Sequence, residues 1–325
     1  MTPLAGVRPH RNLQTGLTTS PAFKEGRMPE ESLNDTPQQR ARKAFIDLVT
    51  REEDAAIDLA QAALLIALEE YPDLDIASCL AQLDLLAQRV RSELGLPGPD
   101  QLPQLPTKLD LLTVIGAMNL VLFEQDHFKG NQADYYSPSN SFLNKVLEKR
   151  KGIPITLSLV YMEVGKRVGL QIEGIGLPFH FIVRCRLPGG YTYIDPFEHG
   201  RLLSEEECRE RIYRVFKRKT DFDPHWFEPV SHKQLLIRML TNLKHIYTHQ
   251  EDYVRALSIC DRILLLAPGT LSERRDRGIV HFHLKHYARA VKDLAAYVEH
   301  APTGEDTSDI QRQIKAIRQM IAMLN

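Results

Sequence analysis

Residues 151–197 read KGIPITLSLVYMEVGKRVGLQIEGIGLPFHFIVRCRLPGGYTYIDPF. In the first part of this stretch, apolar residues recur at steps of three and four: Leu157, Val160, Tyr161, Val164 and Val168. This spacing predicts a helix with one apolar face. Pro154 is typical of a first helical turn and Gly169 of the residue that ends a helix, so we expect about four turns.

The second part carries the β-branched and aromatic residues of strands. We expect strands at 171–175 and 179–186, then a turn at 187–190 and a further strand at 191–194. His180 is therefore expected on a strand and Asp195 at the end of the hairpin that follows. A helix packed on a small antiparallel sheet makes an α+β core.

The composition describes an ordinary globular protein. The chain has 325 residues, 43% of them hydrophobic and 26% charged, with a net charge of -1. The length predicts about two domains. A near-neutral charge supplies no strong field for nucleic acid or anionic lipid, and no segment is long and apolar enough to span a bilayer. We therefore expect neither nucleic acid nor membrane as a partner.

Cysteine usage and the start of the chain predict a cytoplasmic protein. The four cysteines are widely scattered and show no CxxC spacing, which favours a reducing compartment. Residues 1–36 lack the apolar run of a signal peptide and are expected to form a disordered tail. Whether Met1 or Met28 is the start stays open.

The region before the quoted stretch is helical in character. Apolar residues at helical spacing predict helices between Pro37 and about Leu94, followed by a Pro-rich loop, a helix at 109–123 and a helix at 142–149. After Asp195, Ser204 is followed three residues later by Glu207, which predicts a capping box and a helix to about Lys217. We assign residues 37–225 to one domain with an N-terminal helical subregion.

The last hundred residues contain a repeat. Three residues recur 34 positions later, a spacing that is the length of a tetratricopeptide unit: Tyr253 and Tyr287, Ala256 and Ala290, Pro268 and Pro302. Leu243, Tyr247 and Gly278 also fall on consensus positions. We expect an all-α region at 226–325, with repeats at about 237–270 and 271–304 and a capping helix after them. Repeats of this kind usually bind proteins, so Leu243, Tyr247, Tyr253, Gly278 and Tyr287 are candidate binding positions and equally candidate packing positions.

Part of a thiol catalytic site is present in the quoted stretch. Such a site needs a cysteine at a helix N-terminus, a histidine base and an Asp or Asn that orients the histidine. His180 and Asp195 supply two of these parts in the expected order. A structural role for the pair, a binding role and a catalytic role all stay open.

The chain resembles the bacterial SirB family, whose core belongs to the transglutaminase-like superfamily. The resemblance is carried by residues 152–158, 177–181 and 194–197, together with Tyr161 and the C-terminal repeat pair. It implies a papain-like α+β core followed by tetratricopeptide repeats. Active members of the superfamily carry cysteine two residues after a glycine, and this position falls on Pro154. The resemblance therefore implies a core without its nucleophile.

Two functions follow as alternatives. The first is a non-catalytic protein, a pseudoenzyme, that acts as an interaction or regulatory factor and binds an unknown protein partner through the repeats. The second is an unconventional hydrolase or transferase on a peptide or amide bond, with His180 as base, Asp195 as its orienter and Thr156 or Ser158 as nucleophile. We favour the first because Ser and Thr near a helix start often bond backbone carbonyls instead.

Metal ions and cofactors are not expected. The 12 histidines include close pairs on predicted helices, such as His245 with His249 and His283 with His286, but no cysteine or carboxylate accompanies them at ligand spacing. Phosphate-binding glycine motifs are absent from the sequence. The partner, any substrate and the oligomeric state cannot be read from the sequence.

Overall fold

Helix α6 (Pro154–Val168) organises the first part of the chain in the computed structural model, which describes residues 36–98, 104–107, 109–216, 223–301 and 305–324. Pro154 occupies the first helical turn, and Gly169 ends the helix in the left-handed conformation with φ 102°. Twelve of its fifteen residues are buried, as expected for a helix that has neighbours on all sides. The predicted bounds of this helix are confirmed.

Four strands form an antiparallel sheet in chain order beside α6: β3 (Ile172–Ile175), β4 (Ile182–Leu187), β5 (Gly190–Asp195) and β6 (Arg201–Leu203). Two short strands, β1 (Lys129–Gly130) and β2 (Lys151–Gly152), pair in parallel just before α6. β6 was not predicted from the sequence. It lies on the outer side of β5, where its three residues extend the sheet.

The prediction that His180 lies on a strand is wrong. β4 begins two residues later, at Ile182. Phe179 has φ 60°, and the His180 N–H donates to Leu177 O at 3.2 Å, so residues 177–180 form a turn. The chain needs this turn because β3 and β4 are antiparallel neighbours.

Helices cover the core around α6: α1 (Pro37–Arg51), α2 (Leu59–Leu68), α3 (Ile76–Glu93), α4 (Leu111–Asn119), α5 (Leu143–Lys149) and α7 (Glu205–Phe216). α4 continues as a π-helical turn over Leu120–Gln125. The capping box before α7 is confirmed, because Glu207 N–H donates to Ser204 Oγ and Ser204 N–H donates to Glu207 Oε2. Thr36 forms a similar box with Gln39 before α1; the predicted tail otherwise lies outside the described residues, as do Met1 and Met28.

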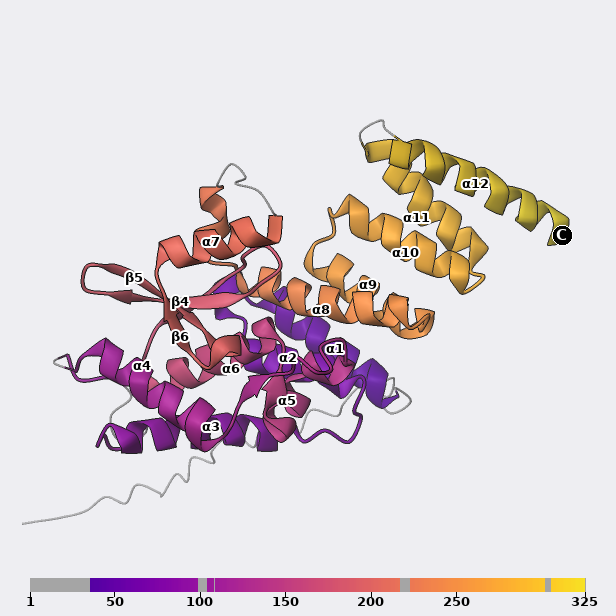
Figure 1. The fold of residues 1–325 in the computed structure, drawn as a ribbon. Coiled ribbons are helices and arrows are strands. Elements are labelled where there is room, and N and C mark those ends of the chain that lie inside the picture. Colours follow the sequence, from indigo (N-terminus) through magenta and orange to yellow (C-terminus); the bar gives the residue numbers. More distant parts are fainter. Residues whose placement is uncertain (1–35, 99–103, 108, 217–222, 302–304, 325) are drawn as a thin grey trace, which may run out of the picture. The chain divides into compact units, whose positions relative to one another are not determined.

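Five helices follow in the C-terminal part: α8 (His232–His249), α9 (Tyr253–Leu266), α10 (Leu271–His283), α11 (Tyr287–His300) and α12 (Glu305–Leu324). Figure 1 shows α9 to α12 arranged one after another, in orange and yellow. Each helix packs on the next, and Gly278 of α10 lies against Leu294 of α11. This is the helix-pair stacking of a repeat array.

The first of these helices shares its core with the transglutaminase-type elements. Leu236 and Leu240 of α8 are fully buried in the same apolar cluster as Leu157 and Val160 of α6. Asp54 caps α8 by accepting hydrogen bonds from the backbone of His232 and Lys233. Residues 36–325 therefore pack as one unit.

Among the described residues, no helix combines the length and the apolar character that crossing a bilayer requires.

Candidate functional site

His180 and Asp195 are in direct contact. His180 Nε2 lies 2.8 Å from Asp195 Oδ2. Asp195 is completely buried, whereas the His180 side chain is 23% exposed. The carboxylate fixes the ring orientation, and in the tautomer whose Nε2–H donates to this carboxylate, Nδ1 is left as an acceptor. A base or hydrogen-bond acceptor at the surface is thus available.

Arg211 of α7 holds the same carboxylate from the other side. Its Nη1 lies 2.6 Å from Asp195 Oδ2, and its Nη2 donates to Glu198. The backbone N–H groups of Phe197 and Glu198 donate to Asp195 Oδ1. Burial opposes ionisation of Asp195, but the bonds from His180 and Arg211 outweigh it and lower the pKa of this carboxyl. Asp195 is therefore held as a carboxylate with every acceptor position used.

The turn that carries His180 is anchored by a residue of α8. Arg238 of α8 donates from Nη2 to Leu177 O at 2.7 Å and to His180 O at 2.6 Å. Its guanidinium also lies over the Phe181 ring, 5.3 Å from the centroid. Phe179, in the middle of the turn, is 74% exposed in a left-handed conformation that bulky residues rarely adopt.

A pocket of about 350 Å³ opens beside His180. It is lined by the start of α6, the aromatic loop before it, the His180 turn and α8: Tyr135, Tyr136, Ile153, Pro154, Ile155, Phe179, His180, Phe181, Arg238 and Asn242. Pro154 and His180 thus line the same pocket. The residue that the N-terminus of α6 contributes there is a proline, whose ring has no nucleophilic atom. A second pocket of about 440 Å³, lined by Arg201 and Arg211 among others, lies on the other side of His180.

The hydroxyl of Thr156 is fully engaged elsewhere. Thr156 is completely buried, donates to Asn140 O at 2.7 Å and accepts from Ile153 N–H at 3.1 Å. It therefore closes the first turn of α6 and ties it to the loop before α5. The structure shows no hydrogen bond between Thr156 and His180 in the described chain.

Ser158 and Cys185 are equally withdrawn from the pocket. Ser158 is completely buried and points at Phe181 O, 3.5 Å away. Cys185 is 2% exposed in the core on β4. The His180–Asp195 pair is thus brought together by the fold, while neither of the two suggested nucleophiles, nor the Cys185 thiol, lines its pocket.

All four cysteines are free and buried. Burial raises the pKa of each thiol, for Cys208 to about 12. These thiols are neutral packing groups at neutral pH.

The histidines do not gather into a metal site within the described ranges, where no three His, Cys, Asp or Glu side chains are placed to hold an ion. His283 stacks on Tyr253 with ring centroids 4.1 Å apart, and His281 lies beside His286 with 3.3 Å between their Nδ1 atoms. Burial lowers the pKa of His281.

The candidate binding positions in the repeats divide by exposure. Leu243, Tyr247 and Gly278 are buried and pack the helices together, whereas Tyr253 and Tyr287 are half-buried. The first three are therefore packing residues. Arg238 and Asn242 on α8 were not singled out in the sequence, where nothing separates them from other polar residues on a helix.

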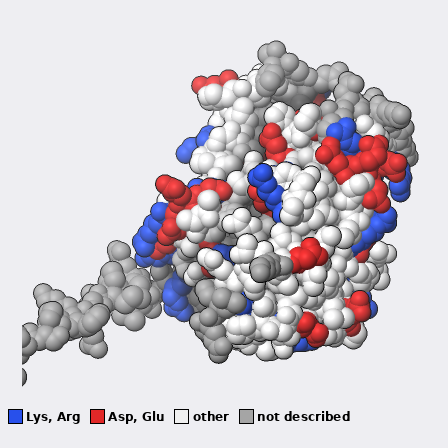
Figure 2. Space-filling view, turned by 90° about the vertical axis from the view of Figure 1, so that its left-hand side faces the viewer, with Lys and Arg blue, Asp and Glu red and all other residues white. Residues whose placement is uncertain are grey.

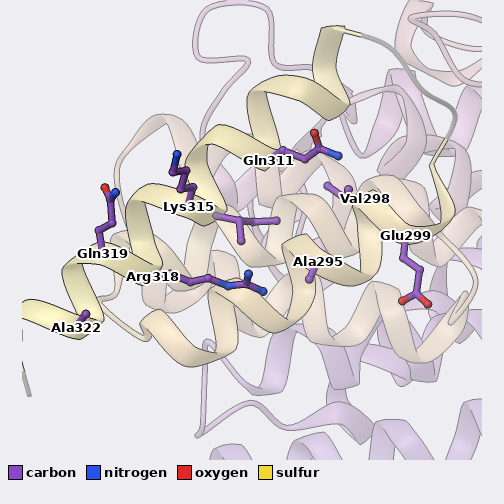
Figure 3. A pocket seen from close by; sticks show the side chains of 9 residues that line it. Ala295, Val298, Glu299, Gln311, Lys315, Arg318, Gln319 and Ala322 are labelled. Carbon is purple, nitrogen blue, oxygen red and sulfur yellow. The ribbon is translucent and has the colours of Figure 1, made fainter.

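A further hollow of about 590 Å³ lies between α11 and α12. In Figure 3, Val298 and Ala295 of α11 face Arg318 of α12, while Lys315 and Gln319 project outward. The face in Figure 2 shows groups of charged side chains in which acidic and basic residues lie next to each other. Wide uncharged areas separate these groups. Among the described residues of this face, no large patch of basic side chains is present.

Comparison with known proteins identifies the class. Residues 77–241 match the family model described as transglutaminase-like superfamily, and residues 243–322 match a tetratricopeptide repeat model. No solved structure matches. The chain therefore belongs to the transglutaminase-like superfamily, and the predicted α+β core followed by an all-α repeat region is confirmed.

The relatives include several bacterial proteins. A UPF0162 protein of Xylella fastidiosa is 35% identical over 254 residues, which cover 77% of this chain and 86% of that protein. A UPF0162 protein of Vibrio cholerae is 28% identical over 200 residues, or 61% and 74% of the two chains. Human F-box only protein 21 is 32% identical over 182 residues, or 53% of this chain and 28% of that protein. Within the superfamily, this chain belongs with the UPF0162 proteins.

Proposed function

We propose that this protein is a non-catalytic interaction factor that binds a polypeptide partner in the cleft between the His180 turn and α8. The observation that carries the proposal is that Pro154 and His180 line the same pocket. The position that would hold a nucleophile is occupied by the ring of Pro154. A peptide bound in this pocket therefore contacts the His180 imidazole, which can orient it, but no side chain that could attack it.

The alternatives to Pro154 support the same conclusion. The Thr156 hydroxyl is bonded to Asn140 O and to Ile153, and the Ser158 hydroxyl lies against the Phe181 carbonyl in the core. Both would have to leave buried backbone groups to reach His180, which costs about 1–3 kcal/mol for each group left unpaired. An enzyme that used either hydroxyl would have to break hydrogen bonds that stabilise its own fold.

Exposed aromatic side chains around the pocket support binding. Tyr136 is 76% exposed, Phe179 74% and Tyr135 38%. Aromatic residues dominate the energetically important positions of protein interfaces, because they bury a large area while losing little conformational entropy. Tetratricopeptide repeats generally mediate protein–protein contacts, and the repeat match begins at residue 243, directly after Asn242 of this pocket.

We extend the proposal to the family of the protein and to its place in the cell. It is a member of the SirB family that works in the cytoplasm of a bacterium, with a protein as its partner. The four buried free thiols and the bacterial UPF0162 relatives support this view.

The test separates binding from catalysis. The full chain is incubated with an equimolar library of random decapeptides, the complex is isolated by gel filtration, and retained and unretained peptides are analysed by mass spectrometry. We expect retained peptides of unchanged mass for wild type and for His180→Ala. Tyr136→Ala and Phe179→Ala should reduce retention, and Val254→Ala, which removes an exposed apolar side chain from α9, serves as the matched control.

Two outcomes would contradict the proposal. Peptide fragments that carry the mass of an added water, and that disappear with His180→Ala, would show hydrolysis and restore the enzyme alternative. Retention that persists in the Tyr136 and Phe179 variants but is lost on substitution in the α11–α12 hollow would move the binding surface away from the cleft.

A further inference from the structure

The cleft beside His180 contains a positive charge without a negative partner. Arg238 donates to two backbone carbonyls, yet no carboxylate lies within ion-pair distance of it among the described residues. Burial lowers the pKa of Arg238, and the only nearby group that opposes this is the Tyr135 hydroxyl. By contrast, Arg211, Arg262 and Arg277 each pair with at least one carboxylate.

The rest of the pocket lining carries no negative charge. None of the ten residues that line it is Asp or Glu. Besides Arg238, its polar groups are the His180 imidazole, the Asn242 amide and the hydroxyls of Tyr135 and Tyr136. The N-terminal end of α6, whose dipole favours anions, also opens here through Ile155. A partly buried cation that lacks a protein anion favours a ligand that brings one.

The apolar part of the pocket limits what kind of anion fits. Ile153, Pro154 and Phe181 form an apolar wall beside the polar groups. The volume of about 350 Å³ lies at the small end of the range for ligand pockets. The last residue of a peptide offers a carboxylate and a side chain from one Cα atom, so it can occupy both parts. An acidic side chain would bring the carboxylate alone and leave the apolar wall uncovered.

We propose that this pocket binds the C-terminal carboxylate of a polypeptide whose last residue is apolar, with Arg238 and Asn242 as the carboxylate ligands. The inference rests on the proposed function and names the part of the partner that enters the cleft. Arg238 supplies the charge and Asn242, one helical turn further along α8, supplies an amide donor on the same face. The Asn242 side chain makes no hydrogen bond with another described residue, so its amide is available.

The experiment measures the affinity of the full chain for octapeptides by fluorescence polarisation. The peptides end in Leu, Phe, Ser or Lys, carry a fluorophore at the N-terminus, and exist as free acids and as C-terminal amides. We expect the free acids ending in Leu or Phe to bind best. Amidation should weaken binding by about tenfold to a hundredfold, the loss that follows when a charged hydrogen bond is removed.

Variants of the two ligands identify the pocket. Asn242→Asp places a negative charge beside Arg238 and should remove the preference for free acids while leaving the weaker binding of amides. Because the Asn242 side chain makes no hydrogen bond with another described residue, this variant should fold normally. A thermal melt checks this. Arg238→Gln should act in the same direction, Arg238→Lys should retain part of the preference, and Arg318→Gln on α12 is the control that should change nothing.

Each outcome decides between the two proposals. If amides bind as tightly as acids, the carboxylate site is wrong while peptide binding stands. If amidated peptides bind through an internal Glu, and lose this binding with Arg238→Gln, the ligand is an acidic side chain and the assignment to a chain terminus is wrong. If neither acids nor amides bind, both this inference and the proposed function fail.

Discussion

Arg238 donates a hydrogen bond to the backbone carbonyl of His180 across 2.6 Å, although the two residues are 58 positions apart. Arg238 belongs to α8 and His180 to the turn before β4. The turn that presents the imidazole is thus held by α8, and Phe179 keeps its left-handed backbone within this arrangement.

The charge on Asp195 should stabilise the fold. Asp195→Asn keeps the shape of the side chain and removes the charge that faces His180 and Arg211 inside the protein. We expect a loss of about 3 kcal/mol in the free energy of unfolding at pH 7, since breaking a buried pair strands the partner charge. Guanidinium chloride unfolding measures it, and Glu210→Gln at an exposed site on α7 is the control.

The pH dependence has a defined sign. The folded-state pKa of Asp195 is lowered below the ordinary value of 3.8, so its contribution is present above that value and is lost as the pH falls through the folded pKa. The difference between wild type and Asp195→Asn should therefore shrink at pH 3. An equal difference at pH 7 and pH 3 would mean that the charge is not the stabilising feature.

Thr156 should behave as a structural residue. Thr156→Ala leaves the N–H of Ile153 and the carbonyl of Asn140 without this partner in a buried place, and we expect a loss of about 2 kcal/mol. Thr156→Ser keeps the hydroxyl and should cost about 1 kcal/mol for the missing methyl group. Thermal melts compare the two. A normal melting temperature for Thr156→Ala would argue against this role.

Asp54 should couple the repeats to the core. Asp54→Ala removes the cap that accepts from the backbone of His232 and Lys233 and from the Ser231 hydroxyl. We expect a loss of about 1–2 kcal/mol and faster amide exchange in the first turn of α8. Asp58→Ala, which removes the cap of α2 instead, should leave the exchange of α8 unchanged.

The cap at Asp54 should also weaken in acid. Burial opposes its ionisation, but the N–H groups of Lys233 and His232 outweigh this and lower its pKa below 3.8. Protonation at lower pH removes the acceptor charge, so the effect of Asp54→Ala should fall as the pH drops below that value. Persistence of the full effect at pH 3 would contradict this.

Gly278 should be required for repeat packing. A Cβ atom at this position would lie 2.8 Å from Leu294 Cγ, so Gly278→Ala should cost about 1–3 kcal/mol through overpacking. Combining Gly278→Ala with Leu294→Ala should restore part of the space between α10 and α11. The two changes in the free energy of unfolding should then be non-additive in a double-mutant cycle. Gly116→Ala on α4 meets nothing within 4 Å and should be neutral or stabilising.

Much of the fold was predictable because its signals are local. The spacing of apolar residues predicted α6, and Pro154 and Gly169 predicted its ends. Ser204 and Glu207 predicted the capping box at the start of α7. Such signals depend on neighbours within one or two turns of the chain. The His180 turn was placed on a strand because aromatic and β-branched residues surround it, and the left-handed Phe179 gives no signal of its own in the sequence.

The site was only half predictable. His180 and Asp195 were found by their residue types and order, whereas Arg211, Arg238 and Asn242 were not, because each comes from a helix whose position beside the turn is set by packing. A polar residue on a helix face looks the same in the sequence whether it meets solvent or a cleft.

The sequence by itself determined helix α6, the capping box before α7, the 34-residue repeat and the absence of a cysteine at the start of α6, since these follow from local propensity, spacing and residue identity. Only the tertiary structure decided that Thr156 is bonded to Asn140, that Pro154 shares a pocket with His180, and that Arg238 enters it. The physical reason is that hydrogen bonds, burial and charge balance are made between elements distant in the chain, and their energies exist only once those elements have packed.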